Sequence, residues 1–144
     1  MATVTQVAAP VVGTNRTVGV SNATNSEKFV CFNYTSALVT QAVFIAPNAC
    51  VITGIAGVTR VAGSGGACTI SFYKCSDGIA VGSGTLLHSA NFDIAGTADI
   101  NQYLTLSTNM ADLQMVAGDR IGYVLTGTAT SAVGSITITI ERNV

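Results

Sequence analysis

This sequence has unusually few charged residues. Only 9% of its residues are Asp, Glu, Lys or Arg, whereas 49% are hydrophobic. An ordinary soluble domain of this length would carry about 36 charged residues, because their average share is about 25%. A folded monomer of this mass exposes about 6,900 Å², which leaves about 500 Å² for each charge. We interpret the deficit as a mark of assembly, since extensive interfaces are depleted in Lys, Glu and Asp.

Clustered positive charge is also missing. The formal net charge is -1, and the six basic residues stand singly along the chain, at Arg16, Lys28, Arg60, Lys74, Arg120 and Arg142. Proteins that bind nucleic acid neutralise phosphates with grouped Lys and Arg. We therefore expect no nucleic-acid partner.

Long uninterrupted hydrophobic runs are absent as well. The most apolar stretch, Ala42 to Val58, is broken by Pro47 and Asn48, and a membrane-spanning helix needs about 18 apolar residues in a row. The N-terminus has no basic segment followed by a short apolar core, which a secretory signal would show. We expect no membrane partner, and a product that stays in the cytoplasm until assembly or lysis.

Residues that carry chemistry are few and scattered. His88 is the only histidine, and no motif supplies the nucleophile and the orienting carboxylate that a catalytic histidine needs. Ser83 lies between two glycines without the context of a nucleophile elbow. The aspartates are dispersed and form neither a glycosidase pair nor a calcium loop. The sequence predicts no enzyme, no catalytic residues, no metal site and no cofactor, with His88 as a polar strand residue.

The four cysteines, Cys31, Cys50, Cys68 and Cys75, have no CxxC spacing and no histidine cluster nearby. Zinc and redox sites are therefore not indicated. We expect reduced, buried thiols that act as small apolar side chains. Were disulfides to form, four cysteines would allow three pairings, among which the sequence does not choose.

What the chain does contain is a series of runs of β-branched residues, separated by clusters of Gly, Asn, Asp and Ser. Residues 1–27 show no sustained periodicity and are predicted to be an extended N-terminal arm. From residue 28 to residue 144, short alternating runs recur at intervals typical of a sandwich or barrel. We predict an all-β domain, an antiparallel β-sandwich of about eight strands with a jelly-roll-like fold, and few helices.

Alternation is clearest at Ser135 to Glu141, where Ile136, Ile138 and Ile140 share the face that we assign to the core. Ala67 to Lys74 and Arg120 to Thr126 alternate in the same way, and Gly118 is expected to take a positive φ in the turn before the second of them. Further strands are predicted at Phe29–Tyr34, Leu38–Ile45, Ala49–Val61, Thr85–Phe92 and Gln102–Leu106, with Met110–Met115 either a helical turn or a short strand.

Aromatic residues occur singly among these strands. Phe44, Phe72 and Phe92 are expected in the core, which is the common fate of a Phe on an alternating strand. Tyr73 and Tyr103 are candidates for an outward face.

Four stretches taken in order, FIAPNACVITGIAGVTRV, GGACTISFYKCSDG, GSGTLLHSANFD and LQMVAGDRIGYVLTGTA, resemble the head decoration, or cement, proteins of tailed phages. The resemblance covers about Leu38 to Val144. It implies a jelly-roll-like protein, often a homotrimer, that lies on the outer capsid surface of the virion. There it would bind the major capsid protein and hold neighbouring coat subunits together without a catalytic site.

The residues that would make such contacts are predicted on physical grounds in the arm. An extended segment can add a strand to an open sheet edge with little demand on side-chain identity. Two stretches suit this role, Thr3–Val12 and Thr17–Val20, and the candidate partner-binding residues are Thr3, Val4, Val7, Val11, Val12, Thr17, Val18 and Val20. A low-charge face of the sandwich is expected to form the self-association interface.

A tail-fibre, baseplate or adhesin module that binds a host glycan or receptor is the alternative. It would use the same sandwich but expose aromatic or polar residues in distal loops. No aromatic residue occurs in the loop at Gly63–Gly66 or in the segment Asp93–Asn101. This favours the structural role.

Overall fold

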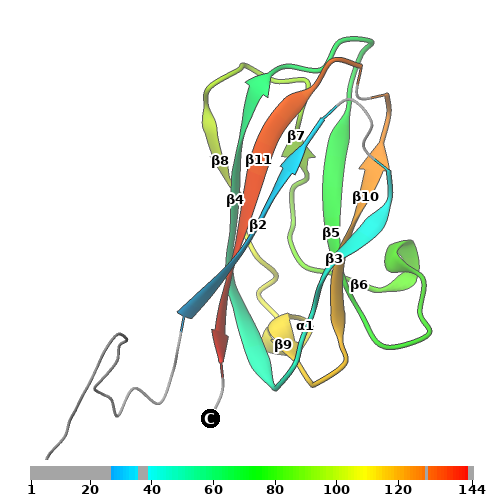
Figure 1. The fold of residues 1–144 in the computed structure, drawn as a ribbon, viewed down its shortest axis with the longest axis vertical. Helices are drawn as coiled ribbons and strands as arrows, with labels where there is room; N and C mark the ends of the chain where they lie inside the picture. The colour runs from blue at the N-terminus through cyan, green and yellow to red at the C-terminus, as the bar shows by residue number, and fades with distance from the viewer. Residues whose placement is uncertain (1–26, 36–38, 129, 143–144) are drawn as a thin grey trace, which may run out of the picture.

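Two antiparallel sheets packed face to face make up the described part of the chain (Figure 1). The computed structural model describes residues 27–35, 39–128 and 130–142. Among these residues the only helical pieces are a single turn of α-helix, α1 (Met110–Leu113), and a 3-10 turn, η1 (Val81–Ser83). The all-β class and the antiparallel sandwich predicted from the sequence are confirmed.

One sheet, here the β11 sheet, has the strand order β2-β11-β4-β8, and β9 also pairs with β4. The other, the β10 sheet, has the order β3-β10-β5-β6, and β7 also pairs with β5. The bounds are β2 Glu27–Tyr34, β3 Gln41–Ile45, β4 Cys50–Val61, β5 Thr69–Cys75, β6 Thr85–Leu86, β7 Phe92–Asp93, β8 Asn101–Tyr103, β9 Gln114–Met115, β10 Arg120–Thr126 and β11 Val133–Arg142.

The ten strands of the described residues fill eight positions, because β6 and β7 share one edge of β5 while β8 and β9 share one edge of β4. Six of the nine connections between these strands cross from one sheet to the other, and the first described strand pairs with the last. This order is that of a double-sheet jelly roll, in agreement with the predicted fold.

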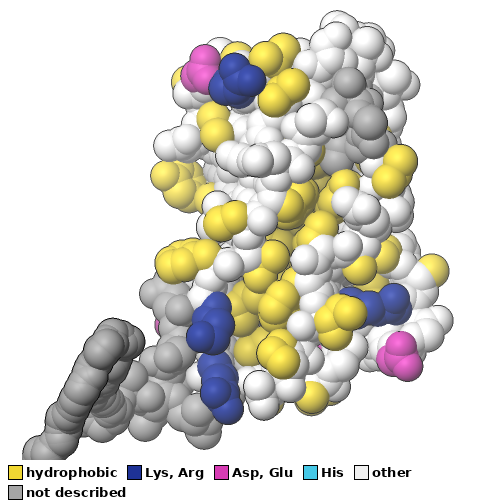
Figure 2. Space-filling view, in the orientation of Figure 1, with side chains coloured by type: hydrophobic (Ala, Val, Ile, Leu, Met, Phe, Trp, Pro, Cys, Tyr) yellow, Lys and Arg dark blue, Asp and Glu magenta, His cyan; other side chains and the backbone are white. Residues whose placement is uncertain are grey.

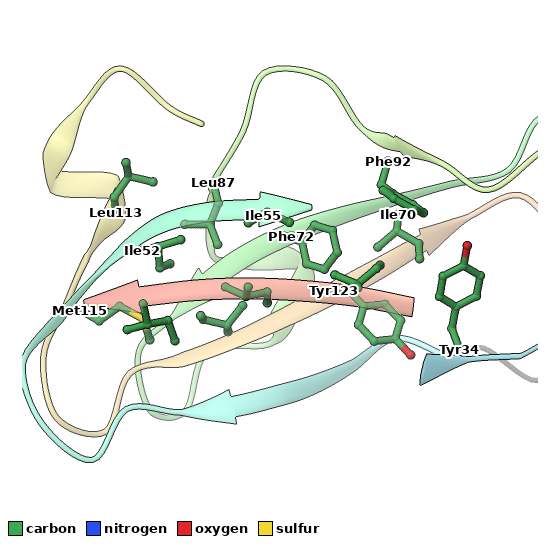
Figure 3. Packing of buried hydrophobic residues seen from close by; sticks show 14 of the residues in the cluster. Tyr34, Ile52, Ile55, Ile70, Phe72, Leu87, Phe92, Leu113, Met115 and Tyr123 are labelled. Atoms are coloured by element: carbon green, nitrogen blue, oxygen red, sulfur yellow. The ribbon is translucent and has the colours of Figure 1, made fainter. Parts of the chain in front are cut away.

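Side-chain alternation places the core as the sequence predicted. Ile136, Ile138 and Ile140 of β11 are buried, as are Ile70 and Phe72 of β5. Figure 3 shows Phe72 and Tyr123 among the other hydrophobic side chains that lie between the sheets. The turn before β10 also follows expectation, since Gly118 has a φ of 94°.

The predicted strand Thr85–Phe92 is corrected, because it is broken into β6 and β7. Leu87 and His88 are both buried at the break. The backbone N–H of Phe72 donates to Nε2 of His88 at 2.8 Å, so an imidazole replaces a backbone carbonyl as the acceptor on this edge. Met110–Met115, which the sequence left open, contains both α1 and β9.

Candidate interaction surface

The arm residues predicted to bind a partner, Thr3, Val4, Val7, Val11, Val12, Thr17, Val18 and Val20, lie outside the described residues. What the structure does describe is the strand into which the arm leads. Glu27 is the first residue of β2 and pairs with Glu141 of β11. The arm therefore joins the sandwich at an edge strand.

His88 lies inside the sandwich and is 3% exposed. Burial lowers the pKa of its imidazole, and the nearby backbone of Ala90 opposes this effect to a smaller extent. The ring packs edge-on against Phe72 with centroids 5.8 Å apart. Since Nε2 already accepts a backbone hydrogen bond, this histidine holds a sheet edge together.

Within the described ranges, no three His, Cys, Asp or Glu side chains are grouped so that they could hold a metal ion. No helix among those residues is long and apolar enough to cross a membrane.

Three of the four cysteines, Cys50, Cys68 and Cys75, are free and buried, as predicted. Burial raises the pKa of each of these thiols. The prediction is wrong for Cys31, which is exposed. Its position explains this, because Val30 and Phe32 on either side turn toward the core and alternation points Cys31 outward.

The outer face of the β11 sheet carries three cross-strand rows without a charged residue. Because directly opposite residues of an antiparallel pair lie on the same side of a sheet, the register defines these rows. They are Phe29–Thr139–Gly54, Cys31–Thr137–Ala56–Tyr103 and Asn33–Ser135–Val58–Asn101. We call these eleven residues the bare face; each of them is exposed or half-buried.

Large hydrophobic side chains stand at two opposite edges of the bare face. Phe29 on β2 is 62% exposed and Tyr103 on β8 is 76% exposed. Between them, the small side chains of β11 and β4 leave a shallow hollow of about 200 Å³ beside Tyr103, lined in part by Ala56 and Thr137. The outward position predicted for Tyr103 is confirmed. Tyr73, the other candidate for an outward face, is half-buried.

The outer face of the β10 sheet differs, because the segment 76–84 folds over it. The methyl groups of Val81 lie so close to Gly122 of β10 that a Cβ built there would meet them at 2.7 Å. Nη2 of Arg120 donates to the carbonyl oxygens of Ser76 at 3.1 Å and Ile79 at 2.6 Å. Sγ of Cys75 donates to the carbonyl oxygen of Val81 at 3.3 Å. Part of this outer face is therefore covered by the chain itself.

A second uncovered region lies between the edge strands β2 and β3. Four half-buried residues, Val30 and Phe32 of β2 with Val43 and Phe44 of β3, pack against the core from this side. We call these four residues the seam. Figure 2 shows hydrophobic side chains gathered along the middle of this view, between the two sheets.

Sequence reasoning predicted a low-charge face but did not identify which one. The signal was present in the alternation of β11, because the residues opposite the buried isoleucines are Ser135, Thr137 and Thr139. The neighbours of those residues across the strands depend on pairing between distant segments, which a single sequence does not reveal.

No protein-family model matches the chain, and no curated protein sequence matches it. Among solved structures, it is similar to a chain of the cyanophage Pam1 capsid asymmetric unit, with 16% identity over 95% of this chain and 91% of that one and a TM-score of 0.49. A chain from the disulfide-linked pili of Bacillus endospore appendages has 20% identity over 84% of this chain and 89% of that one, with a TM-score of 0.38.

A chain of infectious bursal disease virus, strain Gx, is 11% identical over 83% of this chain and 32% of that one, with a TM-score of 0.44. Of the structures described here, two come from virus particles and one from a pilus. Because all three identities and TM-scores are low, we base the functional proposal on the chain's own surface.

Proposed function

We propose that this chain is a structural protein of a virus particle, a capsid decoration or cement protein that binds the outer shell of a bacteriophage. In this role it bridges neighbouring coat subunits and thereby stabilises the capsid. The observation that carries the proposal is the bare face, where eleven neighbouring residues on four strands include no charge.

Composition supports an interface at this place. The buried centre of a protein interface is depleted in charged residues and enriched in aromatic ones, and aromatic anchors contribute most of the binding energy. Phe29 and Tyr103 supply such anchors at the two edges of the bare face. The uncharged centre between them would bring no unpaired charge into a contact, which would otherwise oppose binding.

Two kinds of partner are proposed. Copies of the chain associate through the bare face as a homotrimer, and the trimer binds the major capsid protein. Closed rotational symmetry is the common outcome of self-association. Joining several subunits makes individually weak shell contacts act together, so that the avidity exceeds each single affinity.

In the same proposal the arm makes the main-chain contacts with the shell. Thr3, Val4, Val7, Val11 and Val12 are β-branched residues in a stretch that adds a strand to an open sheet edge of a coat subunit. Thr17, Val18 and Val20 form the second such stretch. Neither nucleic acid, membrane nor cofactor has a part in this function, and no catalytic step is proposed.

The test is a charge placed at the centre of the bare face. Thr137→Lys should weaken binding to empty capsids at least tenfold, since burying an unpaired ammonium group opposes association. The matched control is Ser83→Lys, which adds the same charge to an exposed position of the segment that covers the other sheet. Binding isotherms together with sedimentation would measure capsid affinity and self-association. Equal affinities for the two variants would contradict the proposal.

A second candidate function is a tail-fibre, baseplate or adhesin module that binds a host glycan. One observation favours it: the ring of Tyr103 stands exposed beside a hollow that is also lined by Asn101, Ser135 and Thr137. Aromatic rings with a few polar groups around them are common in ligand sites. A glycan array screened with the wild-type chain and with Tyr103→Ala separates the two, because only a glycan-binding module gives signals that the variant loses.

A further inference from the structure

The two longest open sheet edges of the described chain lie on the same side of the sandwich. β2 pairs only with β11, and β3 pairs only with β10. In an antiparallel strand, every second residue directs its N–H and C=O away from the partner strand. The free edge of β2 therefore offers a row of backbone donors and acceptors, which a further strand could use.

The seam beside this edge opens into the core. The ring of Phe32 stacks on that of buried Tyr123 with centroids 5.3 Å apart and an interplanar angle of 3°. At the end of the seam where β2 begins, a small cavity of about 100 Å³ is lined mostly by apolar residues, among them Phe44 and Ile140, with Lys28 and Arg142 also contributing. Covering the seam would bury apolar surface that is otherwise in contact with water.

The chain itself has a segment of suitable length that starts at this edge. Twenty-six residues precede Glu27, and Arg16 is the only charged side chain among them. The six residues directly before β2, Ser21 to Ser26, are SNATNS, a composition typical of turns. Thr17–Val20 lies just before that turn and puts Val18 and Val20 on one side of an extended chain.

Tethering favours this segment over any other occupant of the free protein. A segment joined by a few residues has an effective concentration in the millimolar range, which exceeds the concentration of a second copy in a dilute solution. We propose that Thr17–Val20, with the few residues before it, pairs with the free edge of β2 of its own chain and covers the seam.

This arrangement separates the two stretches of the arm. β2 has eight residues and spans about 26 Å at about 3.3 Å per residue, so about eight residues ending at Val20 would match it. Thr3–Val12 then leaves the sandwich beyond the Tyr34 end of β2, where it remains available to another chain. The inference concerns the free protein: in the proposed function Thr17–Val20 leaves the edge of β2 before it pairs with a coat subunit. The inference stands whether or not that exchange occurs.

Hydrogen exchange on the full-length chain tests the inference. The amides of β2 that face away from β11 should exchange at least a hundredfold more slowly than unstructured amides. Replacing both Thr17 and Val18 by proline removes two neighbouring N–H groups and prevents ladder pairing. This variant should lose at least tenfold of the protection at those amides, while the amides within the β10–β5 pair keep theirs.

The arm provides a matched control, because Thr3 and Val4 repeat the same residue pair. The variant Thr3→Pro with Val4→Pro should leave the protection of β2 unchanged, and so should a tenfold dilution of the wild-type protein. Fast exchange of the outward β2 amides in the wild type would overturn the inference. So would equal losses in the two proline variants, or protection that disappears on dilution, which would identify a second copy as the occupant.

Discussion

The two sheets of this sandwich present opposite kinds of outer face. On the β10 sheet, the segment 76–84 packs Val81 against Gly122 and is fastened by Arg120. On the β11 sheet, every residue of the bare face is exposed or half-buried and none of them is charged. The contrast shows that a low-charge sheet can be protected from water by its own chain or can be left for a partner to cover.

The largest effect is expected from a pair of glycines, one on each face. Gly122→Ala should lower the free energy of unfolding by about 1–3 kcal/mol, since the new methyl group would overlap Val81 and the carbonyl oxygen of Gln41. Gly54→Ala on the bare face should change it by less than about 0.5 kcal/mol, because the nearest atom to its Cβ is Oγ1 of Thr139 at 3.5 Å. Chemical denaturation measures both. Equal losses would show that the bare face is as tightly covered as the other.

A smaller change in stability is expected when the hydrogen bonds from Arg120 to the segment 76–84 are removed. Arg120→Met removes two hydrogen bonds to backbone carbonyls and should destabilise the protein by about 1 kcal/mol. Opening of the segment should also make Cys75 react faster with an alkylating reagent, because its thiol lies against Val81. Cys68, which is buried in the core, is the internal control. Unchanged alkylation of Cys75 would mean that Arg120 does not hold the cover in place.

The last effect depends on pH and again distinguishes the two sheets. Because burial lowers the pKa of His88 below its usual 6.5, the unfolded chain takes up a proton at a higher pH than the folded chain. Stability is therefore complete above about pH 6.5 and falls as the pH drops below it, by at most about 1.4 kcal/mol per pH unit.

His88→Gln should remove this part of the pH dependence while keeping an acceptor for the N–H of Phe72. Hydrogen exchange at pH 5 and pH 7.5 would locate the change, which is expected at β5 and β6 of the β10 sheet. A loss of exchange protection at pH 5 that begins in β11 instead would contradict the assignment to His88.

Local patterns predicted much of this fold. The alternation in Ser135–Glu141 identified the inward isoleucines of β11, and the glycine before β10 marked a turn. Such features depend on neighbours in the sequence, where the two-residue period of a strand is direct evidence. The break at His88 was missed because its cause is a contact with Phe72, sixteen residues away.

The candidate surface was less accessible to sequence reasoning. A charge deficit indicated that some face is covered, but the difference between the two faces depends on where the segment 76–84 folds. Val81 and Gly122 are in contact although forty residues separate them in the sequence. Neither residue type predicts this contact. The exposure of Cys31, by contrast, was available from the sequence, because alternation along the predicted strand Phe29–Tyr34 places it opposite Val30 and Phe32.

The pairing of Glu27 with Glu141 brings the beginning of β2 and the end of β11 to the same end of the molecule (Figure 1). A force that pulls Glu27 and Glu141 apart would peel β2 from β11 one residue pair at a time and would meet little resistance at any moment. A force that pulls on the arm while the sandwich is held by one of its faces would instead load many backbone hydrogen bonds at the same time. The protein should accordingly be mechanically weak in the first geometry and strong in the second.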